Sequence, residues 1–540
     1  MQFLYKQKQL EMSKKFFLAL LAPLFMGGLV ACNKQAINDL NTEGQSTGDT
    51  YMSVTFSTAN PNSTRAAVKE DESFNSIGEY IGRDEIKNVN VYVINVPEET
   101  VDVKKFTSVK MNPDSDTNTN DFRTDAWKTT AGEKVVYVYV NIAGTDIESK
   151  LDKATSRKAF EDANEHTYTL TDANGVNEKY AKYDDTTKKD IISMNTVAPF
   201  ELTVEPGIKK EQAENDASPK NRAKLSVRRL VGQAAVTSTN TEYTITENYG
   251  GATNTLGKLS DLKWDVMQYE LTTYLIPTPT ETGKDAKKAE FCKTPWWDLK
   301  VDDASYVESG IGQKYFYSAF NGVEVKQFTR DTDNTKNIKA IVETPMKFIT
   351  ETTHQHGGKL KKDDATNTGA ETGYRKGNTT YVIVSAKITP DDNAWASNEE
   401  KTGYAEGQDL YFGVQDHKFY KDLTKAVAAN KPNTSTLKGG KDNVIKYAEG
   451  ICYYVAWLNP DKANEPIVSP VLRNNIYHVN ISAIKKLGYS GNPFNPKGDN
   501  PKDPDDPTPD PKETLYPVDT YMSVQIDVVN WGVHSRDQEL

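Results

Sequence analysis

The fold class is decided by the stretch KVVYVYV at residues 134–140. A short run of β-branched and aromatic residues between polar turns is typical of a β-strand. Runs of the same character recur along the chain at residues 89–94, 224–227, 233–237, 380–384, 451–457 and 475–481. Many short strands separated by turn residues predict an all-β protein built from β-sandwiches, with residues 148–163 as the best candidate for a helix.

A six-residue sequence, DTYMSV, occurs twice, at residues 49–54 and 519–524. The similarity continues beyond it, because Phe56 corresponds to Ile526 and a polar residue precedes each of them. In both copies the apolar residues share one face and the polar residues share the other, which predicts a half-buried strand. One copy begins the folded region and the other nearly ends the chain.

Two segments with the same inward-facing side chains can fill the same groove. If the first copy is removed, the second copy from another molecule can restore both the ladder hydrogen bonds and the missing side chains. Such contacts are head-to-tail and generate an open filament. The displaced strand then carries Tyr51, Met52, Val54 and Phe56, and the donor strand carries Tyr521, Met522, Val524, Ile526, Val528, Trp531 and Val533. The alternatives are two paired strands of one sheet and a chance match.

The apolar phase of the second copy changes after Val528. From there on, Val529, Trp531 and Val533 are the apolar residues, and they follow the opposite parity. A β-bulge or a crossing between sheets would explain such a change. Trp531 is therefore either an anchor of the inserted strand or a local packing residue.

The N-terminus has the pattern of a secretory signal at residues 1–31. Two lysines precede an apolar run at residues 16–30, and a small residue follows that run. The tetrad LVAC at residues 29–32 resembles a lipobox, which makes Cys32 the predicted lipidation site and Met12 a possible true start. Acyl chains would hold the precursor at a membrane. The alternative is an ordinary signal peptide or a short hydrophobic anchor.

Removal of the first copy requires a cut after it. Residues 60–67 form a polar, turn-rich segment with one basic residue, and such segments are preferred sites of proteolysis. Arg65 is therefore the predicted cleavage site of a trypsin-like enzyme, which would leave Ala66 as the new N-terminus. Lys69 is a weaker candidate, and an ordinary surface arginine is the alternative.

Composition and motifs exclude several classes of function. The 540 residues carry a net charge of −11, which argues against a nucleic-acid binder. The sequence has no Walker phosphate loop, zinc-protease motif or serine-hydrolase elbow, so we expect no enzyme, cofactor or metal. His354 and His356 could bind a metal from one face of a strand, but an exposed loop is the favoured interpretation. Cys292 and Cys452 either pair or remain two separate buried thiols.

Polar segments divide the chain. A charged segment at residues 209–222 predicts a domain boundary or a long loop, and a stretch rich in Pro and Asp predicts an extended spacer stiffened by like charges. The expected regions are a lipidated propeptide at 32–65, an N-terminal β-sandwich at 66–215, a C-terminal β-sandwich at 216–491, the spacer at 492–517 and the donor strand at 518–540.

Several motifs resemble those of Bacteroidales fimbrillins of the type V pilus class. They are IGEY at residues 77–80, DLKW at 261–264, YRKGNTTY at 374–381, AWLNP at 456–460 and RNNIY at 473–477. The resemblance implies two transthyretin-like β-sandwich domains and export as a lipoprotein of the outer membrane, lipidated at Cys32. It also implies maturation at Arg65 by an Arg-specific protease and head-to-tail assembly through the strand from Tyr521 to Val533.

The same resemblance implies a biological role. The extracellular filament would mediate adhesion to bacterial and host surfaces and biofilm formation, together with accessory tip and anchor subunits. A monomeric surface adhesin or glycan-binding lipoprotein is a second hypothesis, and a fimbrial tip or anchor component is a third. A secreted hydrolase with an accessory β-sandwich has no catalytic constellation in the sequence to support it.

Overall fold

The structure is a computed structural model. It describes residues 50–58, 76–80, 82–111, 121–276, 278–279, 292–298, 314–355, 373–431, 443–458, 470–494, 512–513, 515 and 522–531. All of them lie in the compact unit Asp49–Leu540. The predicted lipidation residue Cys32, the cleavage residues Arg65 and Ala66, and most of the predicted spacer lie outside these ranges.

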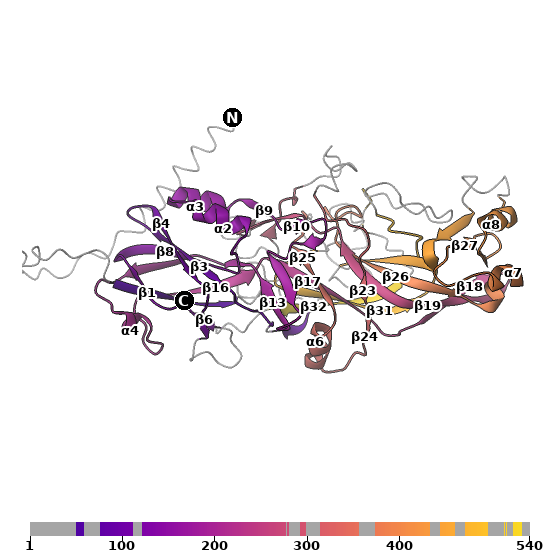
Figure 1. Cartoon of the computed structure of the whole chain (residues 1–540), viewed down its shortest axis with the longest axis horizontal. Helices are drawn as coiled ribbons and strands as arrows, with labels where there is room; N and C mark the ends of the chain where they lie inside the picture. Colours follow the sequence, from indigo (N-terminus) through magenta and orange to yellow (C-terminus); the bar gives the residue numbers. More distant parts are fainter. Residues whose placement is uncertain are drawn as a thin grey trace, which may run out of the picture. The chain divides into compact units, whose positions relative to one another are not determined.

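The largest sheet has 10 strands and contains β1, the first copy of the repeat (Figure 1). In spatial order its strands are β4 (Thr100–Phe106), β3 (Val89–Asn95), β8 (Gly132–Val140), β14 (Met194–Thr196), β16 (Arg222–Arg229), β1 (Thr50–Thr58), β6 (Asp121–Arg123) and β5 (Lys110–Met111). In addition, β15 (Phe200–Val204) pairs with β8, and β7 (Trp127–Thr129) pairs with β1.

The central strands β3 and β8 carry apolar side chains on both faces, and both strands are buried over most of their length. Val89, Val91 and Val93 face a cluster that we call the β1 core, whereas Tyr92 and Ile94 face a second cluster, the central core. The β1 core consists of Met52, Val54, Phe56, Val89, Val91, Val93, Val136, Val138, Val140, Met194, Val204, Ala223, Leu225 and Val227. The alternation of Val and Tyr in KVVYVYV therefore separates two environments.

Two short helices cover the tyrosine face of these strands. They are α2 (Asp146–Asp152) and α3 (Arg157–Asn164), so the predicted helical region at residues 148–163 is confirmed but is interrupted between the two helices. The chain leaves α2 because the backbone N–H of Arg157 donates to the carbonyl of Glu99 (2.8 Å) and Ser156 forms a β-bridge with Thr100. The Ser156 hydroxyl then caps α3 by accepting from the N–H of Ala159 (3.3 Å).

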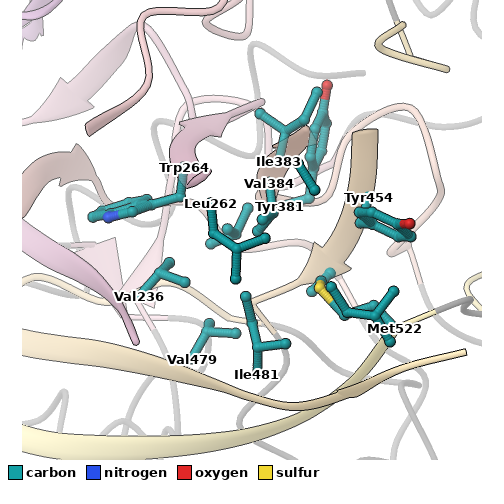
Figure 2. Packing of buried hydrophobic residues seen from close by; sticks show 14 of the residues in the cluster. Val236, Leu262, Trp264, Tyr381, Ile383, Val384, Tyr454, Val479, Ile481 and Met522 are labelled. Carbon is teal, nitrogen blue, oxygen red and sulfur yellow. The ribbon is translucent and has the colours of Figure 1, made fainter. Parts of the chain in front are cut away.

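Two further sheets pack face to face across a third cluster, the sandwich core (Figure 2). The first has six strands, in the order β2 (Ser76–Tyr80), β32 (Met522–Trp531), β31 (Asn475–Ile484), β17 (Val231–Ser238) and β24 (Lys326–Gln327), and β25 (Met346–Thr350) also pairs with β17. The second has five, in the order β18 (Tyr243–Tyr249), β19 (Ala252–Met267), β26 (Tyr381–Pro390) and β30 (Ile451–Trp457), and β23 (Val323–Glu324) pairs with β19.

The remaining elements are short. One sheet has three strands, in the order β28 (Lys418–Tyr420), β27 (Leu410–Gly413) and β29 (Val444–Tyr447). Four more sheets in the described residues have two strands each: β10 (Thr171–Asp172) with β11 (Gly175–Val176), β12 (Ala181–Asp184) with β13 (Lys189–Ile192), β20 (Thr272–Tyr274) with β9 (Thr167–Thr169), and β21 (Thr278–Pro279) with β22 (Cys292–Lys293). The other helices are α4 (Lys210–Ala213), α6 (Asn334–Val342), α7 (Asn398–Thr402) and α8 (Leu423–Ala429), with 3₁₀ turns η5 (Asp392–Ala394) and η6 (Ala448–Gly450).

Strands dominate the described residues, which confirms the prediction of a mainly β protein, and each predicted strand run lies in an observed strand except for Thr380, which precedes β26. The chain passes from the 10-stranded to the six-stranded sheet at Leu230, between β16 and β17. The domain boundary after residue 215 stays a prediction, although β16, which follows it, pairs with β1 and β14.

Candidate strand-exchange site

The first copy of the repeat occupies an interior position of its sheet. β1 runs parallel to β16, from Ser53 opposite Arg222 to Thr58 opposite Val227. On its other side it pairs antiparallel with the short strands β6 and β7. Both edges of β1 are therefore hydrogen-bonded, and its removal would leave a slot between β16 on one side and β6 and β7 on the other.

The apolar face of β1 completes the β1 core. Met52, Val54 and Phe56 each have 0% exposed surface. The ring of Phe56 stacks on Phe122 of β6, with centroids 5.5 Å apart and planes 25° apart. Alternate residues point to opposite faces of a strand, so these three side chains lie on one face, as predicted.

The opposite face of β1 is polar and equally buried at Ser53. The Ser53 hydroxyl donates to the carbonyl of Ala213 (2.7 Å) and accepts from Nε of Arg222 (2.9 Å). Arg222 is itself buried and forms an ion pair with Asp216 (2.9 Å). Burial lowers the pKa of Arg222, while the hydrogen bond that Arg222 donates to Asp216 acts in the opposite direction.

Asn221 holds the start of β1 against the segment after β15. Its side-chain amide donates to the hydroxyl of Thr50 (3.2 Å) and to the carbonyls of Tyr51 (3.1 Å) and Glu205 (2.9 Å). The backbone carbonyl of Asn221 accepts from the N–H of Ser53 (3.1 Å), and the N–H of Tyr51 donates to the carbonyl of Ile208 (3.0 Å). The charged segment 209–222, predicted as a boundary or loop, therefore supplies the polar wall of the slot.

The second copy of the repeat lies in the six-stranded sheet and does not pair with the first. Within its own chain β32 runs antiparallel to β31, from Asn475 opposite Asn530 to Ile484 opposite Met522, and parallel to β2. The alternative of two copies paired in one sheet is therefore wrong, because β1 and β32 belong to different sheets.

The side chains of β32 divide between two cores. Met522 and Ile526 are buried in the sandwich core, and Val524 is half-buried against it. Figure 2 shows Met522 among these side chains, near Tyr454 of β30. Val529 belongs instead to the central core on the other face of the sheet, together with its register partner Ile476.

This division explains the change of apolar phase after Val528. The pairing of β32 with β31 is regular from Val524 to Asn530, so β32 itself neither bulges nor changes sheets there. The parity changes because the end of the strand is covered on the opposite face. The register shifts lie in the neighbouring strands, between Ile481 and Ala483 of β31 and between Ser76 and Gly78 of β2.

Only some of the other predicted site residues lie within the described part of the chain. Tyr51 is half-buried beside a small cluster of Ala126, Ile208 and Ala213. Val528 and Trp531 lie in β32, while Tyr521 and Val533 lie outside the described residues. Sequence reasoning missed Asn221, Arg222 and Asp216, and the only available signal was the exact repetition of a serine that the apolar pattern does not require.

Two other sequence expectations are resolved. Cys292 and Cys452 are both buried and form no disulfide with each other, and burial raises the pKa of Cys452 to about 11. His354 is not in an exposed loop: it is buried, its Nε2 hydrogen-bonds the carbonyl of Asn378 (2.9 Å), and burial lowers its pKa to about 4. The prediction of an exposed loop was wrong at His354 because the glycines that follow it in the sequence do not indicate which distant segments pack over it. His356 lies outside the described residues.

The described ranges hold a sizeable cavity and no cluster of metal-ligating side chains. They contain no group of three or more His, Cys, Asp or Glu side chains that could hold a metal ion. Among the same residues, no helix combines the length and apolar character needed to cross a bilayer. A cavity of about 650 Å³ lies between the β10–β11 hairpin and strands β19 and β25, and Tyr183, Asp265 and Phe316 contribute to its lining.

Comparisons with known proteins place the chain in a family. Residues 445–537 match the family described as "Major fimbrial subunit protein type IV, Fimbrillin, C-terminal", a segment that contains β31 and β32. The Minor fimbrium subunit Mfa1 of Porphyromonas gingivalis is 31% identical over 558 aligned residues, which cover 98% of this chain and 100% of that protein.

Two solved structures show more distant similarity. A Parabacteroides distasonis protein described as a cell adhesion protein aligns with a TM-score of 0.40 and 13% identity over 89% of this chain and 99% of that one. The tip fimbrial protein Mfa3 of Porphyromonas gingivalis aligns with a TM-score of 0.32 and 11% identity over 89% of this chain and 100% of that one. On the strength of the full-length sequence similarity, the chain belongs to the fimbrillin family of fimbrial subunits that includes Mfa1.

Proposed function

We propose that the chain is the stalk subunit of a cell-surface fimbria that polymerises by donor-strand exchange. It is exported as a precursor lipidated at Cys32 and anchored to the outer membrane, and an Arg-specific protease cuts it after Arg65. The cut releases β1, and the donor strand at residues 518–540 of a neighbouring subunit takes its place. Membership of a fimbrial subunit family supports the assembly role.

The observation that carries this proposal is the interior position of β1. Because β1 precedes Arg65 in the chain, a cut there leaves β1 held only by its hydrogen bonds and its buried side chains. Full burial of a Val, Met or Phe side chain contributes about 1.5–3 kcal/mol. The three buried residues of β1 therefore account for roughly 5–9 kcal/mol that an empty slot would lack, which favours refilling it.

The second copy of the repeat has the side chains that could refill the slot left by β1. Met522, Val524 and Ile526 repeat the apolar positions of β1 in the same chain direction, so a residue-by-residue match would run parallel to β16. Each chain has one slot and one donor strand, which generates an open head-to-tail filament. Since tips and anchors need only one of these two parts, the presence of both favours a stalk subunit.

The finer architecture belongs to the same proposal. Two transthyretin-like β-sandwich domains would be followed by the Pro- and Asp-rich spacer, which lets the donor strand reach the neighbouring subunit. The partners are other copies of this chain, tip and anchor subunits, the Arg-specific protease, and bacterial or host surface receptors. The filament would mediate adhesion and biofilm formation.

One observation favours a second candidate, a monomeric surface adhesin or glycan-binding lipoprotein. Both edges of β32 are hydrogen-bonded within its own chain, to β31 and β2, so the backbone of this strand needs no second molecule to complete its hydrogen bonds. The 650 Å³ cavity, with aromatic and charged residues in its lining, would then be the place to look for a bound sugar.

Protease treatment of the purified precursor separates the two candidates. We expect N-terminal sequencing to find Ala66, and electron microscopy to find filaments only after the cut. An Arg65→Ala precursor and a chain lacking residues 521–540 should stay monomeric under the same treatment. Filaments that still form without residues 521–540 would exclude strand exchange by this segment, and retained glycan binding by that truncated monomer would favour the second candidate.

A further inference from the structure

The apolar face of the donor strand does not by itself determine how far the strand enters the slot. Side chains in a strand repeat every two residues, so a shift by two residues keeps the same face inward. In the matched register, Met522 takes the first apolar position of β1. In a register shifted by two, Val524, Ile526 and Val528 take the three apolar positions instead, and all of them are apolar. Burial of the apolar face therefore discriminates poorly between these registers.

The polar position opposite Arg123 does not distinguish the matched register from the shifted one either. Thr55 of β1 is the register partner of Arg123, and within the described part of the chain neither the Thr55 hydroxyl nor Nε of Arg123 has a hydrogen-bond partner. The matched register brings Gln525 to this position, and the shifted register brings Asp527. Both side chains can accept a hydrogen bond from a guanidinium.

The position of Ser53 is different, because its small side chain is fully buried and its hydroxyl makes two hydrogen bonds. Ser53 has 0% exposed surface, and its hydroxyl lies between the carbonyl of Ala213 and Nε of Arg222. Arg222 cannot move away without breaking its ion pair with Asp216 and its hydrogen bond from Nη2 to Ala213 (2.8 Å). A longer side chain would displace a buried charge from its partners, which is costly.

We propose that Ser523 determines the register of the donor strand in the next subunit by replacing Ser53 between Arg222 and Ala213. This inference rests on the proposed strand exchange. Only the matched register places a serine at that position, since a shift by two residues brings in either Gln525 or Tyr521. Within its own sheet Ser523 is only half-buried, so its identity with the fully buried Ser53 is better explained by the slot.

Cysteine crosslinking reads the register directly. Ser57 of β1 is the register partner of Asp121 in β6, so the matched register places Asp527 of the donor opposite Asp121. A chain with Asp121→Cys and Asp527→Cys, cleaved and assembled under mild oxidation, should give intersubunit disulfides along the filament. The parent chain, whose buried Cys292 and Cys452 remain in place, shows the background of intersubunit disulfides without the two new cysteines.

Adding Ser523→Gln to this chain should lower the crosslink yield per subunit roughly tenfold or more, because the buried guanidinium would lose its partner in the matched register. Ser482→Ala is the matched control, since the Ser482 hydroxyl contacts the backbone of Ser523 (3.1 Å) outside the slot, and it should leave the yield unchanged. Ser53→Gln should weaken only the uncleaved precursor, because β1 is absent from the filament. Thermal unfolding of each precursor checks that the variants fold.

The outcomes separate this inference from the proposed function. Filaments that need residues 521–540 but crosslink equally well with Ser523→Gln would overturn the role of Ser523 and leave strand exchange standing. Such filaments without any crosslink between positions 121 and 527 would overturn the matched register. Filaments that form without residues 521–540 would overturn the exchange itself.

Discussion

Truncating one buried side chain in the first copy of the repeat should leave the filament unchanged, whereas the same change in the second copy should weaken it. Phe56 is fully buried in the β1 core and stacks on Phe122, and Ile526 is 4% exposed in the sandwich core. Replacement of a buried Phe by Ala typically costs about 3–5 kcal/mol, and of a buried Ile about 2–5 kcal/mol. Since a domain has only about 5–15 kcal/mol of stability, we expect both Phe56→Ala and Ile526→Ala to destabilise the uncleaved precursor measurably.

After cleavage the two variants should diverge. β1 leaves with the propeptide, so filaments of Phe56→Ala contain no altered residue and should match the parent. Ile526→Ala remains in the filament and leaves a cavity in the slot of every neighbouring subunit, so those filaments should dissociate more easily.

Urea unfolding of each precursor, followed by heating of assembled filaments in SDS and electrophoresis of the ladder, measures both effects. Val103→Ala, at a position in β4 that is 45% exposed, is the control for truncation in the 10-stranded sheet. Equal weakening of Phe56→Ala and Ile526→Ala filaments would refute the reasoning, because it would mean that β1 stays in the assembled subunit.

Two further predictions concern stability. Burial lowers the pKa of His354 from 6.5 to about 4, so between these pH values the unfolded chain binds a proton at this residue and the folded protein does not. As the pH falls from 6.5 to 4, the precursor should therefore lose about 3 kcal/mol of its free energy of unfolding. Unfolding curves measured over a series of pH values should show this loss, and His354→Gln should make it smaller. Glu351 and Arg473 form an ion pair (2.9 Å) with both side chains 1% exposed, so Glu351→Ala should cost about 3–5 kcal/mol in urea unfolding, whereas Asp162→Ala, which breaks the exposed pair with Lys158, should leave the midpoint unchanged.

Membership of the fimbrillin family confirms the prediction of a structural subunit rather than an enzyme. The strand content was also predictable, because β-branched and aromatic runs such as KVVYVYV need a pleated, covered surface whatever the rest of the fold does. The helix at residues 148–163 was not predictable in detail, since its interruption comes from the backbone contact between Arg157 and Glu99, more than 50 residues away in the chain.

The amino-acid sequence by itself determined which segments are strands, that two of them share their inward-facing side chains, and which residues those are, because these properties depend on local periodicity and on identity along the chain. Only the tertiary structure decided that β1 is an interior strand, that β32 divides its side chains between two cores, and that Ser53 meets Arg222 and Ala213. The reason is physical: hydrogen bonds to β1 come from residues 70 to 171 positions away, and no local pattern encodes what will cover a residue from such a distance.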